Sequence, residues 1–404
     1  MYNLTGRRIV LGVAGSIAAY KAVDLASQLT QLGAQVDAVL TEEATRFVTA
    51  LSFASVTGRP AYSDMFAPSE TRPELHVQLG REAELVLVAP ATATTLARLA
   101  LGLADDLLSL TALCTRAPLV LCPAMDSHMW EHPATRENVS RLRERGALVV
   151  GPEVGRLASG QVGPGRLAER ETVLGAVRYV LGQRYGDLRG RRIVVTAGGT
   201  QEPIDPVRYV SNRSSGKMGY AVAEAARDRG AQVTLVTAPT SLPDPYGVET
   251  VHVRTACEMR DAVLKACRDA DALVMAAAVA DFRPAQAAER KLKRGGRDSL
   301  VLEMVPTPDI LGELRGAEGL VRVGFAAETD DLLTNAQKKL QDKALDLLVA
   351  NDVTAPGAGF GTDTNKVVIL HRSGQREDMP LMSKYDVAWH ILDRVAGLLE
   401  GRKT

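Results

Sequence analysis

The chain has 404 residues, of which 46% are hydrophobic and 24% are charged, and its 48 basic residues balance its 48 acidic residues. This length is enough for two domains, and the balanced charge gives no indication of a nucleic-acid partner or of a membrane partner. No apolar run is long enough to span a bilayer or to act as a signal sequence, so we expect a cytoplasmic protein.

The first half of the chain alternates short apolar runs with helical patterns. The strand pattern GRRIVLGV, which begins at Gly6, is followed by a glycine turn, an amphipathic helix and a second strand that begins with GAQV. Further strands are predicted at AELVLVAP, PLVLCPAM and GALVVGP, with helices between them. Alternation of strands and helices builds parallel sheets, so this half is predicted to be a doubly wound α/β domain.

The stretch YVLGQRYGDLRG, residues 179–190, contains three glycines and predicts a domain boundary, which we place between residues 186 and 187. The second half then repeats the opening pattern from Gly190. Its remaining elements are predicted strands at VETVHVR, DALVMAAAV, SLVLEMV, LVRVGFAAE, LDLLVAND and NKVVILHR, and a final helix at KYDVAWHILDRVAGLL. A basic segment, RPAQAAERKLKRGGRDS, interrupts them and is expected to be mobile without a ligand. The predicted fold class is therefore α/β, with two doubly wound domains at residues 1–186 and 187–404.

Polar residues follow the predicted strands of the second half, which is where open α/β sheets bind ligands. The loop VTAGGTQEPIDPVRYVSNRSSGKMG, residues 195–219, is long, polar and basic. Its glycine turn before a helix could bind phosphate or could be an ordinary connection. It is not a P-loop, because Met218 follows the lysine, and TAGGTQE lacks the dinucleotide fingerprint GxGxxG.

Later in this half, Asp281 could contact a nucleotide or cap a helix, and Phe325 could provide a stacking face. Lys339 and Lys343 are spaced four residues apart, so they lie on one helical face, where a polyphosphate could bind between them. The run RKLKR, which contains Lys291, is most simply explained as a solvated surface.

From about Gly190 onward, the chain resembles the phosphopantothenate–cysteine ligase domain of coenzyme A biosynthesis. The resemblance is carried in order by TAGGTQEPIDPVRYVSNRSSGKMG, AAAVADFRP, KLK, TPDIL, GFAAET and KKLQDKALDLLVAND. Bacterial domains of this family use CTP to convert 4'-phosphopantothenate into an acyl-cytidylate. L-cysteine then attacks the acyl carbon and CMP leaves.

This resemblance implies roles for particular residues of the second half. Asn212 would hold the acyl-cytidylate, and Lys291 would act with it as a catalytic residue. Asp281 would also be a ligand of Mg²⁺ at the triphosphate. The residues implied to bind CTP are Asp281, Lys291, Pro308, Asp309, Ile310, Leu311, Phe325, Lys339 and Lys343.

The first half also has polar residues beyond its predicted strands. Gly15 and Ser16 precede a helix and could bind phosphate or form an ordinary turn. The segment VAPATATTLARLALGLADDLLS places the hydroxyls of Thr92 and Ser109 near another strand end. His76 lies in the alternating stretch ELHVQLG, where a single histidine is more often structural than catalytic.

In context, the first half resembles the flavin-dependent cysteine decarboxylase family, including the phosphopantothenoylcysteine decarboxylases. The motifs that carry the resemblance are GSIAAYKA, LHVQL, APATATTLARLALGLADDLL, PAM and GPGRL. Such enzymes bind FMN in a flavodoxin-like domain and typically assemble as trimers. The resemblance implies that His76 is catalytic and that FMN contacts Gly15, Ser16, Thr41, Thr92 and Ser109.

Two positions depart from the family pattern. The family motif PAMN, whose asparagine binds the substrate carboxylate, reads PAMD here, so that Asp126 stands at that position. An ionised aspartate would repel the carboxylate unless it were protonated or turned toward a histidine or arginine. The second departure lies in LASGQVGPGR, which corresponds to a mobile flap in the family. It carries Ser159 where the family has a cysteine that donates a proton, and a serine hydroxyl is a much weaker acid.

Together the two resemblances predict two consecutive steps of coenzyme A biosynthesis, ending in 4'-phosphopantetheine. An alternative keeps the ligase and makes the first half an FMN-binding scaffold. A third hypothesis, an NAD(P)-dependent oxidoreductase, is disfavoured because both halves lack GxGxxG. Family resemblance also predicts a homo-oligomer with trimeric flavin domains and dimeric ligase domains. The four cysteines show no CxxC spacing and are expected to be free thiols.

Overall fold

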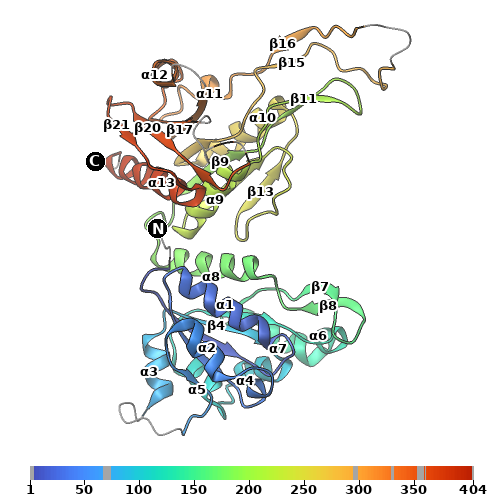
Figure 1. The fold of residues 1–404 in the computed structure, drawn as a ribbon, viewed down its shortest axis with the longest axis vertical. Coiled ribbons are helices and arrows are strands. Elements are labelled where there is room, and N and C mark those ends of the chain that lie inside the picture. Colours follow the sequence, from blue (N-terminus) through green and yellow to red (C-terminus); the bar gives the residue numbers. More distant parts are fainter. Residues whose placement is uncertain are drawn as a thin grey trace. The chain divides into compact units, whose positions relative to one another are not determined.

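The computed structural model describes residues 4–66, 74–293, 299–328, 332–352, 359 and 361–402. The chain forms two compact units, Met1–Leu181 and Gly182–Thr404, each built on a parallel sheet with helices on both faces (Figure 1). The predicted α/β class with two doubly wound domains is therefore confirmed. Across the described ranges, no helix combines the length and the apolar character that a membrane crossing requires.

The sheet of the first unit has six parallel strands in the order β3-β2-β1-β4-β5-β6. Strands β1 and β4 are buried almost throughout, which explains their continuous apolar runs. When the two-residue edge strand β3 is left out and the other strands are numbered in chain order, the strand order is the flavodoxin-like 2-1-3-4-5. The strands are β1 (Arg8–Val13), β2 (Gln35–Leu40), β3 (Ala61–Tyr62), β4 (Leu85–Ala91), β5 (Leu119–Pro123) and β6 (Leu148–Val149).

Helices fill the connections of the first unit, and a short antiparallel hairpin of β7 (Glu153–Arg156) and β8 (Val162–Arg166) follows the sheet. The stretch around His76 is a helix, α3, because Leu75 and Leu79 share one buried face at helical spacing. The helices are α1 (Ala19–Gln31), η1 (Glu43–Arg46), α2 (Ala50–Thr57), α3 (Leu75–Glu82), α4 (Ala93–Leu101), α5 (Leu107–Cys114), α6 (Ser127–Glu131), α7 (Pro133–Glu144) and α8 (Arg170–Tyr185).

The predicted boundary segment, residues 179–190, is not a loop throughout, because α8 continues to Tyr185. Gly182 and Gly186 are needed for close packing: a Cβ on Gly182 would lie 2.5 Å from the carbonyl oxygen of Asp228. These glycines, which belong to the second unit, therefore permit close helix packing within it. The placement of the boundary between residues 186 and 187 remains a prediction.

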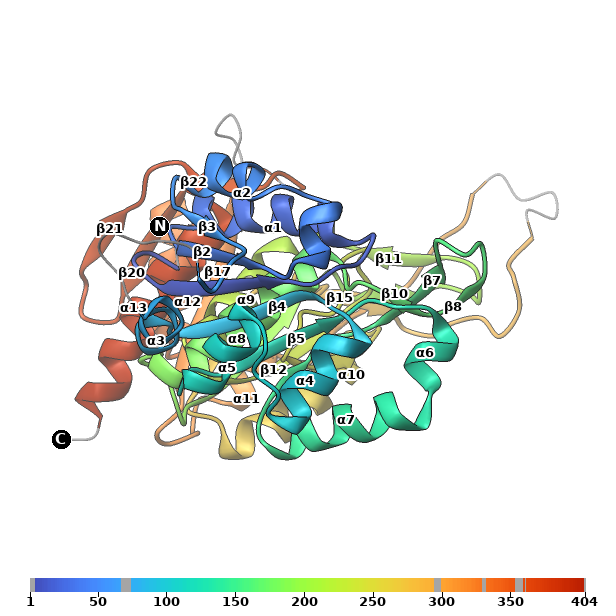
Figure 2. The same ribbon diagram turned by 90° about the horizontal axis from the view of Figure 1, so that it is seen from below.

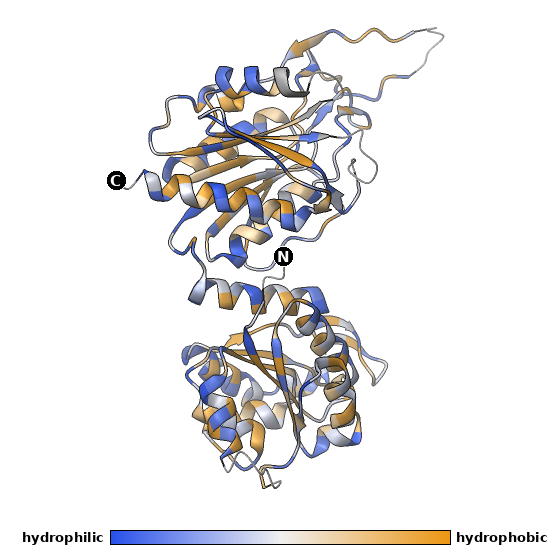
Figure 3. Cartoon of the chain, turned by 60° about the vertical axis from the view of Figure 1, so that its left-hand side comes forward, coloured by the Kyte–Doolittle hydropathy of each residue, from blue (hydrophilic) through white to orange (hydrophobic). Residues whose placement is uncertain are grey.

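The second sheet has eight strands in the order β13-β12-β9-β14-β17-β18-β20-β21, and its first six strands are parallel. Strand order reverses between β9 and β14, which creates the switch point where such sheets bind ligands. Hydrophobic residues gather on the strands of each unit (Figure 3). The strands are β9 (Arg192–Ala197), β12 (Gln232–Thr237), β13 (Glu249–His252), β14 (Ala272–Met275), β17 (Val321–Glu328), β18 (Leu347–Asp352), β20 (Val367–His371) and β21 (Arg376–Asp378).

Helices cover both faces of this second sheet. Helices α9 and α13 share one buried cluster with it, and α10, α11 and α12 share another. Gly219 lets α9 approach β9, since a Cβ there would lie 2.5 Å from the carbonyl oxygen of Thr196. The helices are α9 (Lys217–Asp228), α10 (Ala256–Ala266), η2 (Cys267–Asp269), α11 (Ile310–Glu313), α12 (Leu332–Asp342) and α13 (Lys384–Gly401).

Two predicted features of the second unit were wrong in detail. The loop 195–219 is not irregular throughout, because it contains the hairpin of β10 (Gln201–Pro203) and β11 (Tyr209–Ser211). The stretch SLVLEMV adds no strand to the main sheet, since Val301 is 87% exposed and only its end forms β16 (Met304–Pro306). Strand β16 pairs with β15 (Phe282–Pro284). The described residues between these two strands, 285–293 and 299–303, belong to a projecting arm (Figures 1 and 2).

Part of the basic segment that was expected to be mobile, residues 294–298, lies outside the described residues. A further short pair, β19 (Thr364–Asn365) and β22 (Met382–Ser383), lies just before α13.

Candidate active sites

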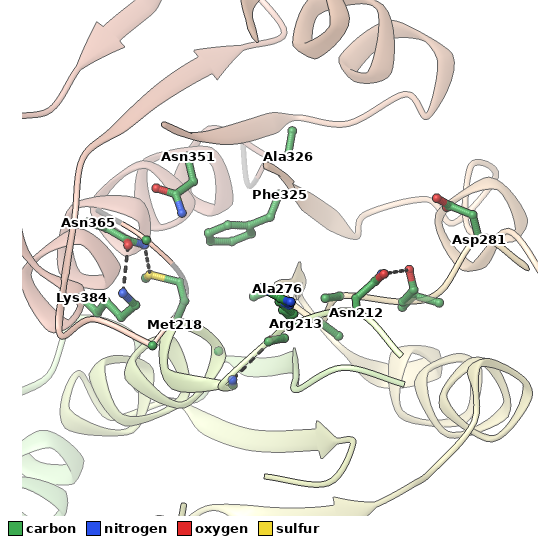
Figure 4. A pocket seen from close by; sticks show the side chains of 18 of the residues that line it. Asn212, Arg213, Met218, Ala276, Asp281, Phe325, Ala326, Asn351, Asn365 and Lys384 are labelled. Atoms are coloured by element: carbon green, nitrogen blue, oxygen red, sulfur yellow. Dashed lines mark hydrogen bonds between the residues drawn. The ribbon is translucent and has the colours of Figure 1, made fainter. Parts of the chain in front are cut away.

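A cleft of about 510 Å³ opens in the second unit beyond the carboxyl ends of β9, β14, β17 and β18 (Figure 4). One wall is the segment 212–219, which leads into α9, and the other walls follow β14 and β17. The cleft thus lies at the switch point of the sheet, as the order of its strands requires.

Asn212 lies in this cleft and is held by a backbone contact. Its Nδ2 donates a hydrogen bond to the carbonyl oxygen of Val279 at 3.1 Å. The backbone of this neighbouring loop is itself fixed, because the N–H of Ala280 donates to Thr200 Oγ1 at 3.0 Å. The predicted acyl-holding residue is therefore oriented by the segment that follows β14.

Three further predicted residues, Asp281, Phe325 and Lys339, also line the cleft (Figure 4 labels the first two). They come from the segment after β14, from β17 and from α12 respectively. The ammonium of Lys339 donates to the carbonyl oxygen of Phe325 at 2.9 Å, which places a cation beside the end of β17. The tertiary structure thus brings four predicted residues to one cavity.

The side chains of the segment Pro308–Leu311 have different surroundings. Ile310 and Leu311 are buried in a hydrophobic cluster with residues of α10 and α12, so only their backbone could contact a nucleotide, and the expected role of this segment stays a prediction. Asp309 caps α11 by accepting a hydrogen bond from Gly312 N–H at 3.0 Å, and it forms an ion pair with Lys343. Burial raises the pKa of Asp309, but Lys343 and the cap outweigh it and hold that pKa below its ordinary value.

Lys291 is exposed on the projecting arm and does not line the cleft. Its neighbour Leu292 is tied to the β10–β11 turn, because Leu292 N–H donates to Asp205 Oδ2 at 3.1 Å. Asp205 also accepts from the backbone of Val207 and from Arg208, and the Arg208 guanidinium holds the pKa of Asp205 well below its usual range. Asp205 therefore fastens the arm that carries Lys291 to the loop that carries Asn212.

A second cleft, of about 380 Å³, lies in the first unit between the start of α1, the segment after β5 and the β7–β8 hairpin. It brings together the two residues that depart from the family pattern: Ser159 Oγ donates a hydrogen bond to Asp126 Oδ2 at 3.2 Å. His76, half-buried on α3, is not among the described residues that line this cleft.

Asp126 is fixed as the N-terminal cap of α6. Its Oδ1 accepts from His128 N–H at 3.0 Å and lies 3.3 Å from His128 Nδ1. The hydrogen bond from the His128 backbone is the main reason that the pKa of Asp126 is lowered, so this carboxyl stays ionised. Of the two arrangements expected for Asp126, the structure shows the one turned toward a histidine.

The residues expected to contact FMN all lie at the carboxyl edge of the first sheet. Gly15 and Ser16 precede α1, and Gly15 is needed because a Cβ there would collide with Glu43. Thr92 caps α4, accepting from Thr95 N–H at 3.2 Å, and Ser109 in the first turn of α5 bonds Asp106. The last of these residues, Thr41, follows β2 and accepts a hydrogen bond from Ala44 N–H at 3.3 Å. Three helix starts and several hydroxyls on one edge suit a phosphate-bearing flavin.

Two family models match the chain. The model described as Flavoprotein matches residues 1–182, and the model described as DNA/pantothenate metabolism flavoprotein C-terminal domain matches residues 188–399. Among similar proteins are three named Coenzyme A biosynthesis bifunctional protein CoaBC. The one from Bacillus subtilis is 44% identical over 400 residues, covering 98% of this chain and 98% of that protein.

The one from Mycobacterium tuberculosis is 46% identical over 412 residues, covering 98% of this chain and 97% of that protein. The one from Vibrio vulnificus is 42% identical over 402 residues, covering 99% of this chain and 100% of that protein. The chain belongs to this bifunctional family. It is therefore an enzyme of coenzyme A biosynthesis whose first unit is a flavoprotein. The hypothesis of an NAD(P)-dependent oxidoreductase does not hold for a member of the bifunctional coenzyme A biosynthesis family.

Sequence reasoning missed one end of the larger cleft in this bifunctional enzyme. There Asn351, Asn365 and Lys384 come from β18, β19 and the start of α13 and lie near Met218 (Figure 4). The sequence offers only a weak indication of these three residues. Each is a polar residue at the edge of an apolar run, and the three are far apart in sequence. Asn365 and Lys384 are 2% and 7% exposed.

Proposed function

We propose that the second unit joins L-cysteine to 4'-phosphopantothenate with CTP, through an acyl-cytidylate, and that the first unit decarboxylates the product with FMN to give 4'-phosphopantetheine. The observation that carries this proposal is the cleft at the switch point, which gathers Asn212, Asp281, Phe325 and Lys339 from separate segments. The names of the relatives, which specify a bifunctional protein of coenzyme A biosynthesis, support it.

The charges at this cleft suit activation of a carboxylate by a nucleotide. Attack of the substrate carboxylate on the α-phosphorus of CTP releases pyrophosphate and increases negative charge on the phosphate oxygens, which cations must stabilise. Lys339, which lines the cleft, would supply one such cation, and Lys343 lies one helical turn further along. Asn212, held against Val279, would orient the acyl group while the cysteine amine displaces CMP.

Magnesium would bind chiefly through the nucleotide. The described residues contain no group of three or more His, Cys, Asp or Glu side chains that could hold a metal ion. Asp281 lines the cleft, and a single carboxylate with phosphate oxygens is a common environment for Mg²⁺. Asp281 is therefore the proposed protein ligand. Lys291, on the arm that follows Asp281 in the chain, would approach the bound nucleotide from outside the cleft.

In the first unit, FMN would be held by Gly15, Ser16, Thr41, Thr92 and Ser109, and it would supply the reversible oxidation of the substrate thiol that permits loss of carbon dioxide. Asp126 and Ser159, hydrogen-bonded to each other, would face the substrate together in the smaller cleft. Because Asp126 is ionised and paired with His128, it would position Ser159 and would not bind the substrate carboxylate directly. His76 is proposed as catalytic on the family resemblance.

We also propose a homo-oligomer, with trimeric flavin units and dimeric ligase units. Large apolar side chains are exposed in both units, including Tyr20 and Leu51 in the first and Tyr209, Phe282 and Val301 in the second. The family resemblance is the basis of this proposal, because single exposed apolar residues are common on folded proteins. Light scattering on the purified protein would measure the number of copies.

A product assay tests the proposed function. Purified protein with FMN receives 4'-phosphopantothenate, cysteine, CTP and Mg²⁺, and mass spectrometry follows the products. We expect 4'-phosphopantetheine, CMP and pyrophosphate. Accumulation of 4'-phosphopantothenoylcysteine would instead leave a ligase with a flavin-binding scaffold. Absence of CMP would overturn the ligase assignment.

A further inference from the structure

Lys384 fixes the orientation of the Asn365 side chain at one end of the larger cleft. The Lys384 ammonium donates to the carbonyl oxygens of Thr362 and Thr364 and, at 2.9 Å, to Asn365 Oδ1. An ammonium group can only donate, so the oxygen of the Asn365 carboxamide must face Lys384. The amide nitrogen of Asn365 then points toward Met218 and the cleft (Figure 4).

That nitrogen has only a weak partner in the protein. Asn365 Nδ2 donates to the thioether sulfur of Met218 at 3.5 Å, and a thioether is a poor acceptor. Asn365 is 2% exposed, and Met218 is the one acceptor that this nitrogen meets among the described residues. This side chain therefore carries a donor, fixed in direction, that a ligand oxygen would satisfy much better.

Asn351 supplies a complementary group in the same part of the cleft. It lies in the last part of β18 and lines the cleft, and its Oδ1 is buried and meets no hydrogen-bond donor among the described residues. A buried carboxamide oxygen without a partner is unfavourable, and a half-turn of the terminal amide can aim either its oxygen or its nitrogen at a ligand. The Asn351–Asn365 pair thus offers one fixed donor and one adjustable group.

We propose that Asn351 and Asn365 form a subsite for the amide of the pantothenate moiety, an inference that rests on the proposed ligase function. The amide oxygen of the substrate accepts from Asn365 Nδ2, and the amide N–H donates to Asn351 Oδ1. A planar secondary amide matches one donor and one acceptor, so Asn351 Oδ1 would gain a donor and Asn365 Nδ2 would gain a better acceptor than the Met218 thioether.

The charges along the cleft support this assignment over recognition of the nucleotide phosphates. The ammonium of Lys384 has three N–H donors and already has three oxygen partners within 3.0 Å, so its donors are occupied before a phosphate binds. Asp281 and Asn212 lie away from the asparagine pair in Figure 4, with Phe325 between them. With the nucleotide at the Asp281 end, the neutral asparagine pair remains for the uncharged part of the acyl substrate.

Two substitutions test the subsite. Asn365→Asp keeps an oxygen for Lys384 but removes the donor, and Asn351→Leu removes both polar atoms at similar volume. The expected result for each is a rise of about 10-fold in KM for 4'-phosphopantothenate with KM for CTP changed less than about twofold, measured by CMP release. Gln375→Leu is the matched control, because it removes an exposed carboxamide outside this cleft and should change neither constant.

A substrate analogue in which an ester replaces the amide gives an independent readout, since it lacks only the N–H. The wild-type enzyme should use the ester less well by about 10-fold, and Asn351→Leu should no longer distinguish ester from amide. Equal use of both substrates by the wild-type enzyme, or a rise in KM for CTP alone, would overturn the subsite while leaving the ligase intact. Failure of the wild-type enzyme to release CMP would instead refute the proposed function.

Discussion

Replacement of Lys384 by methionine should destabilise the second unit by about 3 kcal/mol. Lys384 is 7% exposed, and the substitution keeps the length of its side chain but removes the ammonium. That group donates to Thr362 O at 2.7 Å, to Thr364 O at 3.0 Å and to Asn365 Oδ1 at 2.9 Å. Each such hydrogen bond contributes about 1 kcal/mol net, and all three are lost with the ammonium.

Differential scanning calorimetry of the full chain measures this effect. For a unit of this size, about 3 kcal/mol corresponds to a fall in Tm of roughly 6–12 °C. The transition of the second unit is identified as the one that added CTP raises. Lys366→Met is the matched control, because Lys366 is exposed on the same stretch of chain and its loss should change Tm by less than about 2 °C.

A fall for Lys384→Met no larger than that of Lys366→Met would show that the three hydrogen bonds contribute nothing net. The description of Lys384 as the group that positions Asn365 would then be wrong. A large fall with an unchanged KM for 4'-phosphopantothenate would keep the stability argument but would separate it from the substrate subsite.

Three further outcomes are expected. Asp126→Asn should lower KM for 4'-phosphopantothenoylcysteine in a decarboxylation assay, because it removes an ionised carboxylate from the smaller cleft while an asparagine still caps α6; a raised KM would show that the charge is needed. Burial raises the pKa of Cys122 and of Cys267 to about 12, so iodoacetamide at pH 8 should label Cys114 and Cys257 in the folded protein and all four thiols after unfolding, as peptide mass spectrometry would show. The pKa of Asp309 lies below its ordinary value of 3.8, so its ionised form stabilises the fold above that pH, and the stabilisation is lost as the pH falls below it. Asp309→Asn should therefore flatten the decline in Tm between about pH 4 and pH 2.5, and an unchanged decline would contradict the Asp309–Lys343 pairing.

Several features of the sites could be predicted because they depend on position along a strand. Asn212, Asp281 and Phe325 stand at or beyond the ends of apolar runs, and parallel strands deliver such residues to one edge of the sheet. Other features could not be predicted from local pattern. Ile310 and Leu311 belong to a segment that resembles a nucleotide-binding motif, yet packing against α10 and α12 buries their side chains.

The sequence by itself determined the alternation of strands and helices in both halves, because apolar period and glycine turns act over a few residues. The order of strands in each sheet was decided only by the tertiary structure, since each strand chooses its neighbours through contacts distant along the chain. The same holds for the Ser159–Asp126 contact and for Asn351, Asn365 and Lys384, which meet from separate segments. Their chemistry depends on partners and burial, and these exist only once the chain has folded.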